Sequence, residues 1–212
     1  MYSAIMSSTQ EQQDRRPDTR ERLVRSTQEL LWERGYVGTS PKAILERAEV
    51  GQGSMYHHFA GKSDLALAAI RRTAEGMRET AEQCLSGPGT AYDRVAAYLQ
   101  RERRVLRGCP IGRMTQDRDV VQDPELRRPV DEMFRWLQGR ITEVLAEGQR
   151  RGELAAGLDP AATAAAVAAV VQGGYVLARA ADDTAPFDAA VQGLLTLLAA
   201  QATPGTTTAN DR

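Results

Sequence analysis

The chain has 212 residues, 42% of them hydrophobic, and a formal net charge of −1 at pH 7. This length is sufficient for a buried core, so neither a disulfide framework nor a structural metal is needed for folding. A net charge near zero argues against a protein that coats nucleic acid indiscriminately. The two cysteines, Cys84 and Cys109, are far apart, and no signal-peptide pattern opens the chain, so we expect a cytoplasmic location.

The charge is unevenly distributed along the chain. Residues 15–62 contain nine Lys/Arg and six Asp/Glu, a net charge of +3. Residues 63–212 contain 18 basic and 20 acidic residues, a net charge of −2. This mild asymmetry favours a polyanionic partner at the N-terminal end.

The N-terminal part predicts three helices. Its hydrophobic residues follow the helical period, and no stretch alternates as a strand does. The first helix is expected over residues 18–34, with Gly35 as its C-terminal cap. Ser40 as an N-cap and Pro41 at the first helical position predict a short second helix. A third short helix is expected over residues 52–59.

The rest of the chain predicts longer helices. A fourth helix is expected to begin with Ser63 as its N-cap, and residues 108–117, "GCPIGRMTQD", predict an irregular connection. The remaining helices are expected over 91–106, 124–151, 160–181 and 186–200. The segment 160–181 is apolar or small nearly all round, which predicts burial on more than one side rather than a membrane span. The sequence thus predicts an all-α fold of about nine helices.

The two ends of the chain differ from the rest. Residues 1–17 and 203–212 are polar and lack periodicity, so we expect both to be disordered.

Residues 50–59, "VGQGSMYHHF", form the most distinctive stretch. Two short helices joined by "EVG" and preceded by a third helix are the sequence pattern of a helix-turn-helix, whose second helix enters the DNA major groove. Val50 and Phe59 are expected to anchor the short helix. Adjacent histidines on a helix point about 100° apart, so we expect no metal site here. A phosphate-binding loop would need a preceding strand and a longer glycine-rich run that ends in a lysine, and neither is present here, so we do not expect such a loop.

Residues 39–70, "TSPKAILERAEVGQGSMYHHFAGKSDLALAAI", resemble the DNA-binding region of TetR-family transcriptional regulators. The matching positions are Thr39, Ile44, Ala48, Val50, Gly51, Gly53, Ser54, Met55, Tyr56, His58, Phe59, Lys62 and Leu65. Two positions depart from the family pattern: Leu45 replaces a small alanine, and Glu49 replaces the glycine of the turn. A residue other than glycine in a left-handed turn costs roughly 1 kcal/mol, so we expect a slightly strained turn.

The resemblance implies specific contacts with double-stranded DNA. Lys42 and Gln52 match side chains that reach base edges, with Gly53 and Tyr56 beside them; Tyr56 could equally belong to the core. The positions near phosphates are Ser40, Pro41, Ser54, His57, His58 and Lys62. A helix-turn-helix domain is therefore expected over residues 18–62.

The remaining residues, 63–202, resemble the ligand-binding and dimerisation body of the family. "GCPIGRM" and the later "VVQGGYVLARAADDTAPFDAAVQGLL" are similar to the subgroup that responds to antibiotics or flavonoids. The last two helices combine small residues with an apolar stripe, which predicts a homodimer suited to a palindromic operator. These residues are Ala168, Ala169, Gly173, Gly174, Phe187, Val191, Leu194 and Leu198. Alternatively, they close the core of a single chain.

A cavity for a small apolar or aromatic effector is expected inside the body. Apolar residues with a few polar groups form the usual wall of such a site, although each residue alone fits an ordinary core. The candidate lining residues are Cys109, Ile111, Arg113, Met114, Met133, Phe134, Leu137, Gln172 and Tyr175. The proline and apolar residues beside Cys109 favour an unreactive thiol.

No set of side chains with the pattern of a catalytic site occurs in the sequence, and both histidines lie in the expected recognition helix. We therefore expect a ligand-responsive DNA-binding regulator, with repression as the family default. We expect no enzyme activity, cofactor, metal or membrane partner. Two alternatives remain open: a helical enzyme or carrier that uses the body cavity, and an adaptor that has lost DNA binding.

Overall fold

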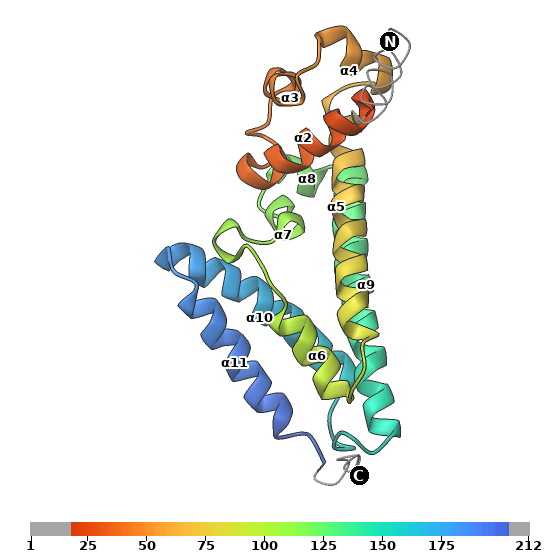
Figure 1. Ribbon diagram of the computed structural model, residues 1–212, viewed down its shortest axis with the longest axis vertical. Helices are drawn as coiled ribbons and strands as arrows, with labels where there is room; N and C mark the ends of the chain where they lie inside the picture. Colours follow the sequence, from red (N-terminus) through yellow and green to blue (C-terminus); the bar gives the residue numbers. More distant parts are fainter. Residues whose placement is uncertain (1–17, 204–212) are drawn as a thin grey trace, which may run out of the picture.

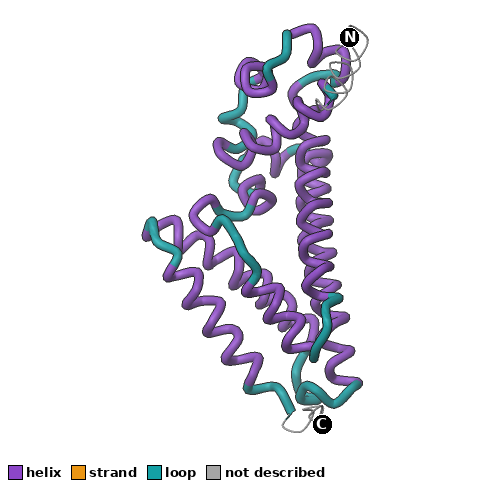
Figure 2. Tube along the Cα trace, in the orientation of Figure 1, coloured by secondary structure: helices purple, strands orange, loops and turns teal. Residues whose placement is uncertain are grey.

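A computed structural model describes residues 18–203, so the expected N-terminal arm and nearly all of the tail lie outside the described residues. The all-α fold is confirmed, because every named element in this range is helical (Figure 2). The only β interaction among the described residues is an isolated bridge between Leu154 and Ala202. The molecule is elongated, with the N-terminal helices at one end and the last two helices toward the other (Figure 1).

The three N-terminal helices are α2 (Thr19–Arg34), α3 (Pro41–Ala48) and α4 (Gln52–His58). The predicted caps at Gly35 and Ser40 are confirmed, whereas α2 begins one residue later and α4 ends one residue earlier than predicted. Gly35 ends α2 with a φ of 74°, a value that favours glycine. The Ser40 hydroxyl caps α3 by accepting a hydrogen bond from the Ala43 amide at 3.1 Å, with Pro41 in the first turn.

Two long helices, α5 (Lys62–Leu85) and α9 (Pro124–Arg150), pack side by side and connect the two ends of the molecule (Figure 1). The Arg140 guanidinium joins them through both oxygens of the Glu82 carboxylate, with Nε–Oε2 at 2.9 Å. The predicted N-cap at Ser63 is wrong. The helix already begins at Lys62, and the Asp64 carboxylate accepts a hydrogen bond from the Ala60 amide at 3.0 Å.

The segment between α5 and α9 contains α6 (Ala91–Gln100), the 3₁₀ turn η1 (Val105–Arg107), α7 (Pro110–Met114) and α8 (Arg118–Gln122). The prediction that α6 extends to residue 106 is wrong. The Arg103 guanidinium binds the backbone carbonyls of Tyr98 and Leu99, both at 2.6 Å, and thereby satisfies the end of α6. The irregular connection expected over residues 108–117 is also wrong, because it contains α7.

The last two helices, α10 (Pro160–Ala181) and α11 (Ala185–Ala199), pack against each other, and α10 also packs against α9. Gly174 allows this close approach, since a Cβ there would lie 2.8 Å from the Phe187 ring. By length and composition α10 could cross a membrane, with a mean hydropathy of 1.6 in its most apolar window. In this fold it packs against protein helices on one face.

Burial in the last two helices differs from the prediction in two ways. The expected burial of α10 on more than one side is wrong for the single chain, because Val176 and Leu177 are 58% and 55% exposed. The apolar stripe that was expected at a subunit contact is buried within the single chain, which agrees with the alternative that these residues close its core. Its residues are Phe187, Val191, Leu194 and Leu198.

The loop between α2 and α3 generates a stability prediction. The Thr39 side chain is 1% exposed, and its hydroxyl donates to the Gly35 carbonyl at 2.7 Å. We expect Thr39→Val to lower the free energy of unfolding by about 1–2 kcal/mol, because the buried carbonyl loses its partner. Thr80 makes the same hydroxyl contact four residues back but on the surface, at 2.8 Å. Denaturant unfolding at one protein concentration should show Thr80→Val within about 0.5 kcal/mol of the unmodified protein; equal losses would contradict this account.

Candidate nucleic-acid interface and body cavities

One face of α4 points to solvent and the other is anchored in the core. Met55 is fully buried and Phe59 is 4% exposed, whereas the side chain of Tyr56 is 57% exposed. Gln52, Gly53 and His57 are also exposed. The anchoring residues fix the helix, so its polar face can meet a partner without unfolding any core.

The two histidines of α4 lie side by side, with ring centroids 4.9 Å apart in an edge-on arrangement. Within residues 18–203, no group of three or more His, Cys, Asp or Glu side chains could hold a metal ion. His57 is exposed, and His58 is half-buried. The imidazoles are therefore available as hydrogen-bond donors at the end of α4.

The remaining predicted contacts lie on α3 and the start of α5. The Lys42 side chain is 86% exposed, with its Nζ 3.9 Å from the Glu46 carboxylate. Such an exposed pair is weak, so Lys42 is free to turn toward an anion. Ser40 is exposed, whereas Pro41 and Ser54 are half-buried. Apart from Lys62, the predicted DNA-binding residues all lie at or within α3 and α4, at one end of the molecule (Figure 1).

Lys62 is held differently from the other predicted phosphate ligands. Its Nζ lies 4.1 Å from the centroid of the Tyr36 ring. Partial burial lowers the pKa of the Lys62 ammonium, and the nearby carboxylates of Asp119 and Asp117 oppose this shift. Lys62 thus contacts the α2–α3 loop and faces the body, and a phosphate contact by its ammonium remains a prediction.

The turn between α3 and α4 has the expected left-handed residue. Glu49 has φ 52° and ψ 47°, and its amide donates to the Glu46 carbonyl at 3.2 Å. The Arg22 guanidinium of α2 donates to the carbonyls of Ala48 and Glu49, the latter at 2.7 Å. Sequence reasoning missed Arg22, because a residue 26 positions before the turn carries no local signal of this contact.

The body holds α2 through Trp32 and Arg107. The Trp32 indole N–H donates to the carbonyls of Arg107 and Gly108, at 3.1 and 3.0 Å. The Arg107 guanidinium lies 3.9 Å from the centroid of the Trp32 ring and pairs with Glu29 at 2.6 Å. Stacking, hydrogen bonding and ion pairing therefore act together at this contact.

A second contact holds the loop after α2. The Asp117 carboxylate accepts a hydrogen bond from the Tyr36 amide at 2.7 Å and a longer one from the Val37 amide at 3.4 Å. Gly35 lies against the same carboxylate, where a side chain would not fit. Residues 105–119 thus contact α2 and its following loop at two points; we call this segment the docking segment.

A cavity of about 270 Å³ lies between α7, α9 and α10; we call it the α7–α10 cavity. It is lined by Gly108, Cys109, Gly112, Arg113, Thr115, Gln116, Phe134, Gln172, Tyr175, Val176 and Arg179. Five of the nine predicted effector contacts are among them: Cys109, Arg113, Phe134, Gln172 and Tyr175. The other four are buried core residues that do not line this cavity: Ile111, Met114, Met133 and Leu137.

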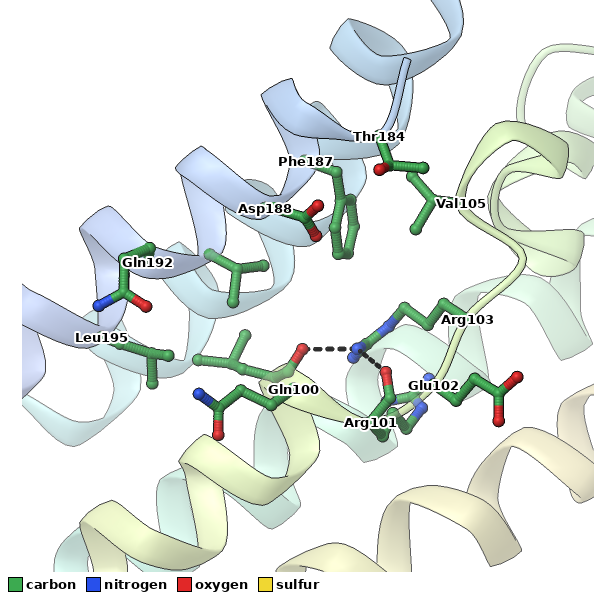
Figure 3. A pocket seen from close by; sticks show the side chains of 12 residues that line it. Gln100, Arg101, Glu102, Arg103, Val105, Thr184, Phe187, Asp188, Gln192 and Leu195 are labelled. Atoms are coloured by element: carbon green, nitrogen blue, oxygen red, sulfur yellow. Dashed lines mark hydrogen bonds between the residues drawn. The ribbon is translucent and has the colours of Figure 1, made fainter. Parts of the chain in front are cut away.

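A second cavity of about 450 Å³ lies between the end of α6 and α11. Figure 3 shows the ring of Phe187 reaching from α11 toward Arg103. Burial lowers the pKa of Arg103, and its guanidinium lies 5.7 Å from the centroid of the Phe187 ring. Sequence reasoning missed this cavity, because its walls come from two segments, residues 99–105 and 184–195, that are far apart in the sequence.

Comparisons with known proteins agree with this architecture. Residues 23–69 match the family of bacterial regulatory proteins, tetR family, and residues 90–194 match the tetracyclin repressor-like C-terminal domain. The chain is 30% identical over 151 residues to the transcriptional regulator AcuR of Cereibacter sphaeroides, covering 68% of each chain. It is 28% identical over 140 residues to the transcriptional repressor NemR of Escherichia coli, covering 62% of this chain and 69% of NemR.

The fold also matches solved structures. A TetR transcriptional regulator from Chloroflexus aurantiacus superposes with a TM-score of 0.78 at 29% identity, covering 87% of this chain and 96% of that one. The chain therefore belongs to the TetR family of bacterial transcriptional regulators, which are ligand-responsive DNA-binding proteins.

The left-handed turn generates a prediction for Glu49. We expect Glu49→Gly to raise the free energy of unfolding by at most about 1 kcal/mol, because glycine removes the strain but loses more backbone entropy. Glu49→Gln keeps the strained backbone and removes the same charge. Denaturant unfolding of the two variants should show a gain for glycine alone; an equal gain for both would mean that charge, not φ, limits stability at this turn.

Proposed function

We propose that this protein is a cytoplasmic repressor that binds a palindromic operator as a homodimer and is released by a small effector with an apolar or aromatic body. The observation that carries DNA recognition is the exposed face of α4, with Gln52, Tyr56 and His57 outward and Met55 buried behind them. Residues 18–62 form the DNA-binding domain, and residues 63–202 form the body. Repression is supported by the similarity to NemR, which is named a repressor.

The subunit contact uses the outward face of the last two helices. Val176 and Leu177 of α10 and Leu197 of α11 are 58%, 55% and 69% exposed. Gly173 adds an open backbone position on α10, since no atom beyond the neighbouring backbone of the helix lies within 4 Å of the place of a Cβ. Exposed apolar residues on two packed helices favour a four-helix contact with a second copy. A two-fold axis then matches two recognition helices to two half-sites.

The effector acts through the docking segment. Six residues of the segment, Gly108, Cys109, Gly112, Arg113, Thr115 and Gln116, line the α7–α10 cavity, and none of the lining residues comes from α5. The same segment binds Trp32 at one end and the Tyr36 amide at the other. A ligand that moves α7 therefore moves α2 directly.

Sequence recognition by α4 is tested by random-duplex selection. We expect Gln52→Ala to change the selected motif at one base step in each half-site, with a loss of about 1–3 kcal/mol for the original base. Gln122→Ala changes an equally polar exposed residue on α8 and should select the original motif. If Gln52→Ala selects the original motif with unchanged affinity, α4 is not the recognition helix.

Binding of the selected duplex should also depend strongly on salt. Several phosphate contacts per subunit release counterions, so the affinity should fall steeply from about 50 to 200 mM salt. Titrations across this range measure the slope. A flat dependence would contradict phosphate contacts by residues such as His57 and Lys62.

The subunit contact is tested by charge insertion. We expect Leu177→Glu to convert the dimer to monomer and to weaken binding of a two-half-site duplex by at least tenfold, because like charges would meet across the two-fold axis. Val121→Glu, on the 40% exposed Val121 of α8, places the same charge outside this face. Sedimentation should show a dimer for Val121→Glu and a monomer for Leu177→Glu; a dimeric Leu177→Glu would move the contact elsewhere.

A further inference from the structure

The charge of the α7–α10 cavity is one-sided. Two arginines, Arg113 and Arg179, line it, and none of its lining residues is acidic. No ion pair joins either arginine to a carboxylate anywhere in residues 18–203. Elsewhere in the fold, Arg107 and Arg140 connect helices through acidic partners. The cavity therefore has an excess of positive charge that the described protein residues do not neutralise.

Arg113 has unused hydrogen-bonding capacity. Its Nη1 donates to the Gln116 side-chain oxygen at 2.8 Å. Its Nε is buried and has no hydrogen-bond partner among the described residues. A buried donor without a partner costs free energy, and a guanidinium presents its N–H groups in a planar fork that matches a carboxylate. Because Nε is itself buried, a carboxylate would supply the missing acceptor after a small rotation of the Arg113 side chain toward the cavity.

The remaining wall supplies neutral polar groups and an apolar surface. Burial raises the pKa of Tyr175 to about 12, so the phenol keeps its proton and can donate a hydrogen bond. Gln172 is held close to the α7 backbone, since a Cβ on Gly112 would collide with its side-chain oxygen. Phe134 and Val176 complete the wall with an aromatic ring and an exposed apolar side chain. A volume of about 270 Å³ limits the ligand to a small molecule.

The larger cavity, between the end of α6 and α11, does not have this one-sided positive charge. Its lining contains Arg101 and Arg103, but also the carboxylates of Glu102 and Asp188. Both terminal nitrogens of Arg103 already bind carbonyls at the end of α6. These two carboxylates would repel an incoming anion, and the α7–α10 cavity, which has no acidic lining residue, is the better anion site.

We propose that the α7–α10 cavity binds a small carboxylate with an apolar or aromatic body, whose carboxyl group pairs with Arg113 and is supported by Arg179. This inference rests on the proposed function and narrows its effector from an apolar molecule to an organic acid. The acid binds residues of the docking segment and of α10 together. Its charge replaces the acidic partner that Arg113 lacks.

The test is calorimetric titration with benzoate, trans-cinnamate and hexanoate, each compared with its neutral primary amide. We expect at least one acid to bind at least tenfold more tightly than its amide. Arg113→Gln should reduce the affinity for that acid at least tenfold and leave the affinity for the amide unchanged. Arg179→Gln should give a smaller loss, because this side chain is exposed. Arg150→Gln removes an exposed charge on α9 outside the cavity and should change neither affinity.

Thermal unfolding of each variant establishes that it folds, and Arg113→Lys, which keeps the charge but not the planar fork, should retain part of the acid affinity. The proposal is overturned if an amide binds as tightly as its acid, if every acid binds more weakly than about 1 mM, or if folded Arg113→Gln keeps full affinity for the acid. A separate experiment, the selection of duplexes by the ligand-free protein, tests the proposed function independently of the anion site. Failure to select any motif refutes the proposed function and leaves the anion site standing, whereas acid binding without dependence on Arg113 refutes the site alone.

Discussion

The docking of residues 105–119 on α2 is the constraint on which the rest of the structure depends. On one side, α2 is tied to α5, where the Gln28 amide donates to the Thr73 hydroxyl at 3.0 Å. On the other side, Trp32 and the loop after α2 are bound by the backbone at Arg107 and by the Asp117 carboxylate. With both sides fixed, the three N-terminal helices cannot rotate independently of the body. The direction in which α4 points is therefore set by a segment that does not belong to the DNA-binding domain.

This constraint explains why the α7–α10 cavity is well placed for regulation. A ligand that binds Arg113 changes the packing of a helix only five residues long, which lies between a contact to α2 and a contact to the loop after it. Small shifts at such a point alter the position of a whole domain, because packed interfaces switch between discrete arrangements. The ligand can change DNA affinity only by the difference between its affinities for the two arrangements. The unneutralised charge in the cavity provides a physical source for that difference.

Sequence reasoning succeeded where the determinants are local and failed where they are tertiary. The 3.6-residue period predicted α9, because buried positions such as Leu137 and Ile141 repeat over many turns. The motif around Glu49 predicted the left-handed turn. Helices of five residues are too short to show a period, so α7 and α8 were missed.

The contacts of Arg22 and Asp117 span 26 and 81 positions and follow from packing, which residue spacing does not encode. The direct-contact residues stay predictions, since they depend on a bound duplex.

The most direct test of this account is the affinity of Asp117→Ala for the selected operator, compared with Asp119→Ala. Both variants remove one negative charge beside Lys62, so electrostatics alone would raise the affinity of both for DNA. Only Asp117 binds the Tyr36 and Val37 amides. The account predicts that Asp117→Ala binds the operator about tenfold more weakly, a loss of about 1.4 kcal/mol, while Asp119→Ala binds at least as tightly as the unmodified protein. Equal or increased affinity for both variants would contradict the claim that the docking segment positions the recognition helix.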